Sequence, residues 1–445
     1  MGQLLGPDFP SDIALAVSGG GDSMAMLYLA HNWTRVYGVR LWVVTVDHGL
    51  RAQSAAEAAM VAEECQALGW PHATLRWHWD GQGNLMDAAR RARLSLIDRW
   101  RGPIAHVLMA HTADDLAETF LQRLKRGSGV DGLSAMAARR RVRPQPGDRT
   151  VLADADITAT HMPPLPARRV AGEPAYSPDF EVLRPCLDMR REHLRHYLKT
   201  LRGRWVDDPS NDDPGFDRVR MRRLLAELEG HGLGVETLAP TARRMARAQV
   251  ALRARAAQVW AAIGQEDRDA GHILFDRTGF SEVEEDTQLR LLAAALQYVS
   301  TAEYRPRLAT LEHLLDRLLS GGAGTLHGCE ARCERRAIRV YREFSQVADT
   351  AEQIGSSTVW DKRWRISGTD FNGLTVRALG EDGWAQAGDK PETAPPFHAA
   401  RSLPSVWSGD RLVWCWPVGV GDRGRILPGA SNNTASDFGT FLLSH

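Results

Sequence analysis

The chain has 445 residues, which is too many for one hydrophobic core and predicts about two to four domains. Its 55 Lys and Arg residues balance its 55 Asp and Glu residues, so a protein whose whole surface is a basic nucleic-acid platform is excluded. A hydrophobic fraction of 43% and a charged fraction of 25% are typical of a globular protein with an ordinary core.

The first distinctive stretch is a glycine-rich turn between a predicted strand over residues 13–17 and a predicted helix from residue 24. The turn has the sequence SGGGDS and consists of Ser18, Gly19, Gly20, Gly21, Asp22 and Ser23. Glycine amides can approach an anion closely, and the N-terminus of the following helix attracts it. Asp22 repels phosphate, so it is better suited to hold Mg2+ against the phosphate oxygens. The turn therefore predicts a metal-assisted phosphate site, with an ordinary surface turn as the alternative.

Strand-like and helix-like segments alternate after this turn. The patterns predict strands over residues 39–46, 74–79 and 104–110 and helices over residues 54–68 and 84–100. Such alternation is typical of a doubly wound parallel α/β sheet with helices on both faces. Ligands of these sheets bind at the carboxyl ends of the strands. The clusters SGGGDS, DHGLR and HTADDLAET each follow a predicted strand, so we expect them to share one site.

The third of these clusters contains two acids, Asp115 and Glu118, at i, i+3 spacing on a predicted helix. This spacing places both carboxylates on one helical face, one turn apart. Two close carboxylates repel each other unless a cation lies between them, and the cation could be Mg2+ or the ammonium of an amine substrate. The alternative is an acidic first helical turn capped by Thr112 or Asp114 and favoured by the helix dipole.

The following segments carry many arginines. Residues 139–180 contain a run of arginines and several prolines but little periodicity, which predicts a long inserted loop. Helical spacing resumes over residues 183–201, residues 205–213 predict a turn, and residues 217–225 begin a basic helix. These arginines could contact RNA phosphates, although a charged, solvated surface is the commoner explanation.

The second half of the chain lacks the strand–helix alternation of the first. Helical patterns cover residues 238–265, 288–299 and 308–319, and residues 325–342 predict a β-hairpin. We therefore expect four parts: a catalytic α/β domain over 1–225, a helical domain with a β appendage over 226–345, a linker over 346–358, and a small β-rich domain over 359–445.

Six motifs in this order resemble those of the tRNA(Ile)-lysidine synthetases, a branch of the PP-loop ATP pyrophosphatases. They are SGGGDS, VDHGLR, AARRAR, AHTADDLAETFLQRLKRGSGVDGLSAM, LRPCLDMRREHLRHYL and WVDDPSNDD. Several PP-loop enzymes share the first motif, whereas DHGLR combined with DDPSN distinguishes this branch. The resemblance covers roughly residues 13–225, and weaker similarity continues beyond them.

The resemblance implies an enzyme that uses ATP to adenylate the 2-carbonyl of the wobble cytidine of a CAU-anticodon isoleucine tRNA. Free lysine then attacks that carbon to give lysidine and AMP, and codon reading changes from AUG to AUA. It implies that residues 18–23 bind the phosphates of ATP and that Asp22 binds Mg2+. It also implies that Asp22, Asp115 and Glu118 act in catalysis: Asp115 and Glu118 hold the lysine amine or a metal, and a carboxylate beside the amine can take its proton as it attacks. The other implied contacts are Arg90, Arg93, His111 and Arg184 to the nucleotide or lysine, and Arg126, Arg218, Arg220, Arg222 and Arg223 to tRNA.

Two alternatives stay open at this point: another PP-loop enzyme such as a tRNA thiolase, and a tRNA-binding protein that has lost catalysis. The chain has neither a long apolar run nor a signal-peptide pattern, so we expect a cytoplasmic protein that does not enter membranes. Its five cysteines lack the spacing of a zinc site, which favours idle thiols. The oligomeric state is open, with a homodimer as one candidate.

Overall fold

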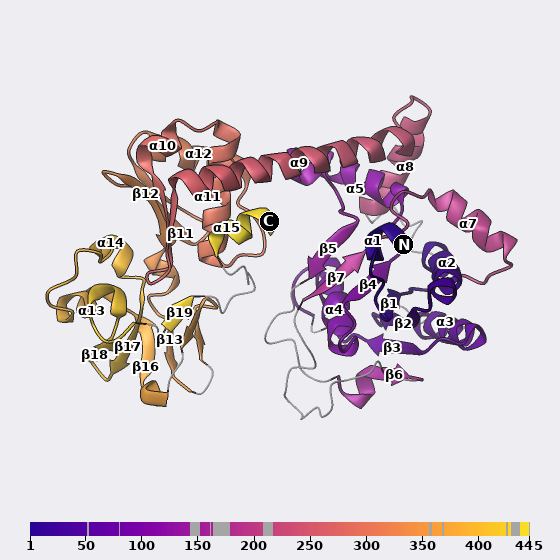
Figure 1. The fold of residues 1–445 in the computed structure, drawn as a ribbon, viewed down its shortest axis with the longest axis horizontal. Coiled ribbons are helices and arrows are strands. Elements are labelled where there is room, and N and C mark those ends of the chain that lie inside the picture. Colours follow the sequence, from indigo (N-terminus) through magenta and orange to yellow (C-terminus); the bar gives the residue numbers. More distant parts are fainter. Residues whose placement is uncertain are drawn as a thin grey trace. The chain divides into compact units, whose positions relative to one another are not determined.

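The computed structural model describes residues 1–50, 53–79, 81–142, 152–160, 162, 179–207, 217–355, 358–366, 369–423, 426–428 and 437–444. The chain divides into two compact units, Met1–Gln249 and Val250–His445, and the division falls inside one helix (Figure 1). In the described ranges, no helix combines the length and apolar character that crossing a bilayer requires.

A seven-stranded sheet with the order β5-β7-β4-β1-β2-β3-β6 forms the centre of the first unit. The five inner strands run parallel, and the edge strands β5 and β6 are antiparallel to their neighbours. The mostly parallel α/β sheet expected from the sequence is thus confirmed. The strand bounds are β1 Asp12–Ala16, β2 Arg40–Asp47, β3 His72–Arg76, β4 His106–Met109, β5 Arg139–Val142, β6 Ile157–Ala159 and β7 Phe180–Leu183.

Helices cover both faces of this sheet (Figure 1). Ile13 and Leu15 of β1 pack on one face with residues of α2, α3 and α7, whereas Ala14 packs on the other face with α4. This alternation follows from the period of two in a strand, and burial on both faces explains the nearly continuous apolar runs. The helix bounds are α1 Gly2–Leu5, α2 Gly21–Tyr37, α3 Ser54–Leu68, α4 Leu85–Trp100, α5 Ala113–Lys125, α6 Val130–Leu133, α7 Arg191–Thr200, α8 Asp217–Glu229 and α9 Val235–Ile263.

The order of the strands creates a crevice beside β1. The chain runs from β1 to β2 and β3 on one side and to β4 and β7 on the other, so the winding direction reverses between β1 and β4. Loops leaving the carboxyl ends of these two strands therefore diverge and leave room for a ligand. The SGGGDS turn follows β1, and the segment that contains Asp115 follows β4.

Two sequence predictions for residues 139–201 need correction. The predicted loop over 139–180 contains strand β5 at its start and strand β6 near its middle, and it ends where β7 begins; β5 pairs with β7 and β6 pairs with β3. Three exposed arginines on β5 suit an edge strand, where charge opposes further pairing. The helix predicted over 183–201 begins only at Arg191, since Leu183 ends β7 and Pro185 follows it. Residues 143–151 and 163–178, including most of the predicted loop, lie outside the described residues.

A separate helical layer packs α8 against the site. Leu116 and Phe120 of α5 share an apolar cluster with Met221 and Leu225 of α8 and with Leu238 of α9. The apolar face of α8 is thereby fixed against α5. The basic residues Arg218 and Arg222, which lie elsewhere around the same helix, are carried to the acidic face of α5 as a consequence.

The second unit contains a larger sheet than the predicted hairpin. Strands β8 Gly264–Asp267 and β9 His272–Asp276 join the hairpin strands in an antiparallel sheet with the order β10-β11-β12-β9-β8. Gly264–Asp267 contains no apolar side chain, which is why its sequence gives no strand signal. The remaining elements of this core are α10 Arg277–Ser281, α11 Glu285–Ser300, α12 Leu308–Leu319, β10 Ala323–Leu326, β11 Cys329–Cys333 and β12 Ala337–Arg342.

The C-terminal part contains two small antiparallel sheets, β13-β16-β17-β18 and β14-β15-β19. Its first strand, β13, lies inside the predicted linker over 346–358, which is therefore not wholly a linker. The last helix carries Phe438 and Phe441 into the core of α11 and α12. The bounds are β13 Ala351–Gln353, β14 Val359–Trp360, β15 Trp364–Ile366, β16 Thr375–Ala378, α13 Gly380–Gln386, α14 Phe397–Ala400, β17 Pro404–Ser408, β18 Arg411–Trp414, β19 Ile426–Pro428 and α15 Phe438–Ser444.

Candidate active site

A cavity of about 1220 Å³ lies at the carboxyl ends of β1, β2 and β4 in the first unit. Its lining includes Ser18, Gly20, Gly21, Asp22 and Ser23 from the glycine-rich turn and the start of α2. Apolar side chains from β2 and α4 line another part, and arginines from α7 and α8 line a third. A hollow with an apolar part, a glycine turn and several cations suits a nucleotide.

The glycine-rich turn is held in one shape by its own hydrogen bonds. The Ser18 amide donates to Ser23 Oγ over 3.2 Å, and Ser23 Oγ donates to the Gly20 carbonyl over 2.9 Å. Gly19 adopts a left-handed φ of 87°, and its carbonyl accepts from the Val206 amide over 3.0 Å. The turn therefore presents Gly20 and Gly21 to the cavity at the N-terminus of α2, where the helix dipole favours an anion.

We expect Gly19→Ala to lower the free energy of unfolding by about 1–2 kcal/mol, because a Cβ is strained in the left-handed region. Its Cβ would meet no atom closer than 3.6 Å, so strain and not collision is the cause. ATP affinity should also fall, since the turn must shift. Gly38→Ala is the matched control, because Gly38 has a left-handed φ of 68°, its Cβ would meet no atom within 4 Å, and it follows the C-terminal end of α2, away from the turn. Chemical denaturation and ATP titration check both variants, and equal loss of ATP affinity in the two would contradict the role of the turn.

Only one of the two carboxylate oxygens of Asp22 has a hydrogen-bond partner. Its Oδ2 accepts from Arg191 Nε over 3.1 Å, whereas its Oδ1 is buried without a hydrogen-bond partner. Burial raises the pKa of Asp22 above its ordinary value, against the lowering effect of Arg191. A buried carboxylate oxygen without a donor fits a hard cation such as Mg2+. Within the described residues there is no group of three or more His, Cys, Asp or Glu that could hold a metal ion.

The start of α5 fixes Asp115 through a reciprocal cap. Thr112 is the N-cap: its Oγ1 accepts from the Asp115 amide over 3.3 Å, and Asp115 Oδ2 accepts from the Thr112 amide over 2.8 Å. The capping alternative raised by the sequence is therefore real for Thr112. It occupies only Oδ2 and leaves Oδ1 of Asp115 directed at other partners.

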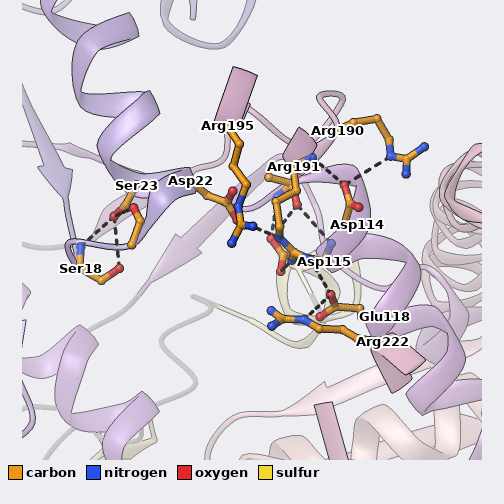
Figure 2. Close-up of polar contacts among 12 residues, drawn as sticks. Ser18, Asp22, Ser23, Asp114, Asp115, Glu118, Arg190, Arg191, Arg195 and Arg222 are labelled. Carbon is orange, nitrogen blue, oxygen red and sulfur yellow. Dashed lines mark hydrogen bonds and ion pairs between the residues drawn. The ribbon is translucent and has the colours of Figure 1, made fainter. Parts of the chain in front are cut away.

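Arg191, the first residue of α7, connects all three predicted catalytic acids (Figure 2). Besides Asp22, its guanidinium donates to Asp115 Oδ1 over 2.9 Å and to Glu118 Oε1 over 3.1 Å. Its amide donates to Asp114 Oδ2 over 2.8 Å, which anchors the helix start. One arginine thus neutralises part of each acid and fixes the distances among them.

Two arginines of α8 complete the arrangement. Arg218 donates from Nε to Glu118 Oε2 over 2.9 Å and from Nη2 to Asp115 Oδ1, and Arg222 donates from Nε to Glu118 Oε1 over 2.8 Å. Asp115 and Glu118 are 4% and 2% exposed, so their charges would be costly without these partners. Although burial alone raises the pKa of Asp115, Arg218 and Arg191 outweigh it and hold this pKa at about 2.

Two histidines line the same cavity in neutral form. Burial and nearby arginines lower the pKa of His111 to about 4, and burial together with Arg93 lowers the pKa of His48 to about 4. The Nδ1 atoms of both rings are buried without a hydrogen-bond partner. Both rings are therefore able to contact a neutral part of a ligand without adding charge.

The chain is 36% identical over 442 residues to the tRNA(Ile)-lysidine synthase of Ruegeria pomeroyi, and the match covers 98% of this chain and 95% of that protein. This chain belongs to the tRNA(Ile)-lysidine synthase family. The corresponding protein of Wolbachia pipientis wMel is 30% identical over 83% of this chain and 79% of its own length. A family model described as a PP-loop domain matches residues 1–152 and 165–229. A U34-tRNA thiolase structure from Methanococcus maripaludis covers 55% of this chain and 75% of its own, with a TM-score of 0.37 and 13% identity.

The tRNA(Ile)-lysidine synthase family is an ATP-dependent ligase family with a PP-loop domain, as the sequence motifs indicate. Of the residues predicted to contact nucleotide or lysine, Arg93 and His111 line the cavity. Arg184 does not: its Nη1 donates to the Ala137 carbonyl over 2.6 Å, and burial lowers its pKa to about 10. Arg90 is exposed on α4 and is not among the described lining residues.

The predicted tRNA contacts fall into two groups. Arg218 and Arg222 point inward onto the acids of α5, and Arg223 also lines the cavity. Arg220 bonds to Asp217 and, like Arg126 at the end of α5, is exposed outside the described lining. Among the motif residues that distinguish lysidine synthases, Arg51 and residues 208–211 lie outside the described residues.

Arg191 and Arg195 are site residues that the sequence analysis misses. Arg195 lines the cavity and donates to Asp207 Oδ1 over 3.1 Å. Both belong to the segment RREHLR, whose spacing predicts only a helix with arginines on a charged surface or against RNA. The available signal was that both residues lie inside the motif LRPCLDMRREHLRHYL, which resembles that of the lysidine synthetases, since no local pattern of charge singles them out.

Proposed function

We propose that this chain adenylates the wobble cytidine of a CAU-anticodon isoleucine tRNA and joins free lysine to its 2-carbon, releasing pyrophosphate and AMP. The observation that carries the proposal is that Asp22, beside the glycine turn, and Asp115, at the start of α5, line one cavity and share Arg191. A phosphate site and an ammonium site that open into one cavity allow both half-reactions to occur on one bound base.

The nucleotide half of the site consists of the glycine turn and Asp22. Amides of Gly20 and Gly21 and the hydroxyls of Ser18 and Ser23 would bind the phosphates, and Asp22 would hold Mg2+. The bound cation would neutralise charge on the phosphates as pyrophosphate leaves. Converting the ring carbonyl oxygen into an adenylate replaces a poor leaving group with AMP, so positioning and neutralisation are what this chain must supply.

The lysine half of the site consists of Asp115 and Glu118. Their carboxylates would hold the side-chain ammonium of lysine, as the sequence analysis expected. One expectation changes: while Arg218 and Arg191 hold the pKa of Asp115 at about 2, its carboxylate is a weak proton acceptor, so Asp115 orients the amine and does not deprotonate it. In this arrangement the role of Asp115 is recognition of a cationic amine.

Binding of tRNA requires a local basic surface, because the whole chain has no net charge. The exposed residues Arg126, Arg220 and Arg223 would supply it near the cavity. We also keep a homodimer as the candidate assembly and the cytoplasm as the compartment.

The experiment that tests the proposal is pyrophosphate release by the purified protein. Unmodified isoleucine tRNA with cytidine at the wobble position should support release, and the same tRNA with uridine there should not. Release should continue to completion only with lysine present. Equal turnover on both tRNAs would keep PP-loop chemistry and remove the assignment of the wobble cytidine. A thiolase, the alternative enzyme, would act on the uridine tRNA.

We expect tRNA affinity to fall about tenfold or more between about 50 and 200 mM salt, because phosphate contacts release counterions. Arg220→Gln should reduce the slope of log affinity against log salt by about one. Filter binding over a salt series checks both. A flat response in the unmodified protein would contradict the proposed basic surface.

A further inference from the structure

The two carboxylates assigned to the lysine amine are already occupied by a cation of the chain itself. Arg218 contacts Asp115 Oδ1 and Glu118 Oε2, which belong to the two carboxylates that an ammonium would bridge. A guanidinium and an ammonium are both cationic donors, so they compete for the same oxygens. This observation raises the question of how lysine enters.

Of the three arginines, Arg218 is the one best placed to leave. Its side chain is 53% exposed, compared with 18% for Arg191 and 27% for Arg222. Arg191 bonds to all three acids, and its amide is anchored to Asp114. Departure of Arg218 would still leave Glu118 with two arginines and Asp115 with Arg191 and its cap.

We propose that Arg218 sets lysine affinity by competing with the lysine ammonium for Asp115 and Glu118, and that a bound phosphate draws it away. The inference rests on the proposed function, since it assumes that these two acids bind lysine. Arg218 lines the cavity together with Arg195 and Arg223, so a phosphate entering there offers it a second anion. That phosphate comes from ATP or from the RNA backbone. Lysine would then bind weakly until a phosphate partner for Arg218 is present. Lysine binding would therefore follow binding of ATP or tRNA, which the activation of the cytidine requires.

The test is lysine binding measured by calorimetry with the full chain, in three states: alone, with a non-hydrolysable ATP analogue, and with tRNA. In the unmodified protein, lysine affinity should rise about tenfold with at least one of the two phosphate ligands. The two additions show which source frees Arg218. Arg218→Gln should bind lysine about tenfold more tightly without either ligand and gain little from them. Arg218→Lys, which keeps the charge but lacks the two-pronged donor set, should lie between.

Lys125→Gln is the matched control. It removes a positive charge from α5 near α8, but its ammonium contacts Asp217 and not the two acids. Its lysine affinity should match the unmodified protein. Circular dichroism and thermal melting establish that each variant is folded.

Two results would overturn the inference. Unchanged or weaker lysine binding by folded Arg218→Gln would show that Arg218 does not compete, and no gain from either phosphate ligand in the unmodified protein would exclude the release step. Asp115→Asn tests whether the acids bind lysine, separately from whether Arg218 competes with it. If this variant still binds lysine normally, the assignment of the acids fails, whatever Arg218 does.

Discussion

Asp22→Asn is expected to lower the rate of pyrophosphate release by about 10³-fold or more, because a bound metal contributes several kcal/mol of charge stabilisation. The substitution keeps the size of the side chain and its capacity to bond Arg191 through the amide oxygen. It removes the negative charge that the buried Oδ1 offers to a cation. Affinity for tRNA should change less than about threefold, since phosphate contacts of the RNA do not involve Asp22. Rates measured over a Mg2+ series, together with tRNA binding, check the expectation.

This variant also decides between an enzyme and a tRNA-binding protein that has lost catalysis. A silent binder would show no pyrophosphate release in either form. Asp8→Asn, an exposed carboxylate near the N-terminus, is the control and should leave release unchanged. Full activity of Asp22→Asn would remove Asp22 from the metal site.

Glu118→Gln is expected to have the second largest effect. Glu118 is 2% exposed and bonds three arginines, so its loss leaves three guanidinium groups with too little negative charge. Breaking a buried ion pair from one side costs about 3–5 kcal/mol, and we expect a loss of unfolding free energy near the lower limit because Gln still accepts hydrogen bonds. Lysine incorporation should fall by about 10²-fold or more. Pyrophosphate release without lysine should fall much less.

Two measurements separate the effect of Glu118→Gln on stability from its effect on the reaction. Denaturant unfolding measures the loss of stability. The ratio of lysine incorporation to pyrophosphate release in the folded protein measures the effect on the lysine step. Glu227→Gln, an exposed carboxylate on α8, should change unfolding by less than about 0.5 kcal/mol. Parallel loss of both half-reactions in folded Glu118→Gln would argue against a lysine site at the acids.

Local patterns were sufficient for much of the first unit. The helix expected over residues 54–68 coincides with α3, and the carboxyl-end rule correctly placed SGGGDS and Asp115 around one cavity. Glycines, caps and apolar runs act over a few residues, so a sequence displays them directly. The position of Asp22 beside the cavity belongs to this class.

The arginine network could not be predicted in the same way. Arg191, Arg218 and Asp115 are far apart in sequence and meet only because α5, α7 and α8 pack together. A basic helix such as α8 has the same local pattern whether its charges face RNA or buried acids. Arg184 shows the converse: its motif suggested a ligand contact, but tertiary packing directs it to a backbone carbonyl.

In the second unit, the misses arise where tertiary pairing overrides weak local signals. Gly264–Asp267 forms β8 although it has no alternating apolar residues, because β9 supplies its partner. Ala351–Gln353, which looked like a linker, pairs with β16 in the same manner. Helix α15 packs on the core of α11 through Phe438 and Phe441. The β-rich pattern expected for residues 359–445 gives no sign of this terminal helix.

The most direct test of the central claim is transfer of labelled lysine to tRNA by the purified protein with ATP. We predict that lysine enters unmodified isoleucine tRNA with a wobble cytidine, with one AMP formed for each lysine, and that it does not enter the uridine tRNA. Pyrophosphate release without lysine in the tRNA, or lysine entry that ignores the wobble base, would contradict the account.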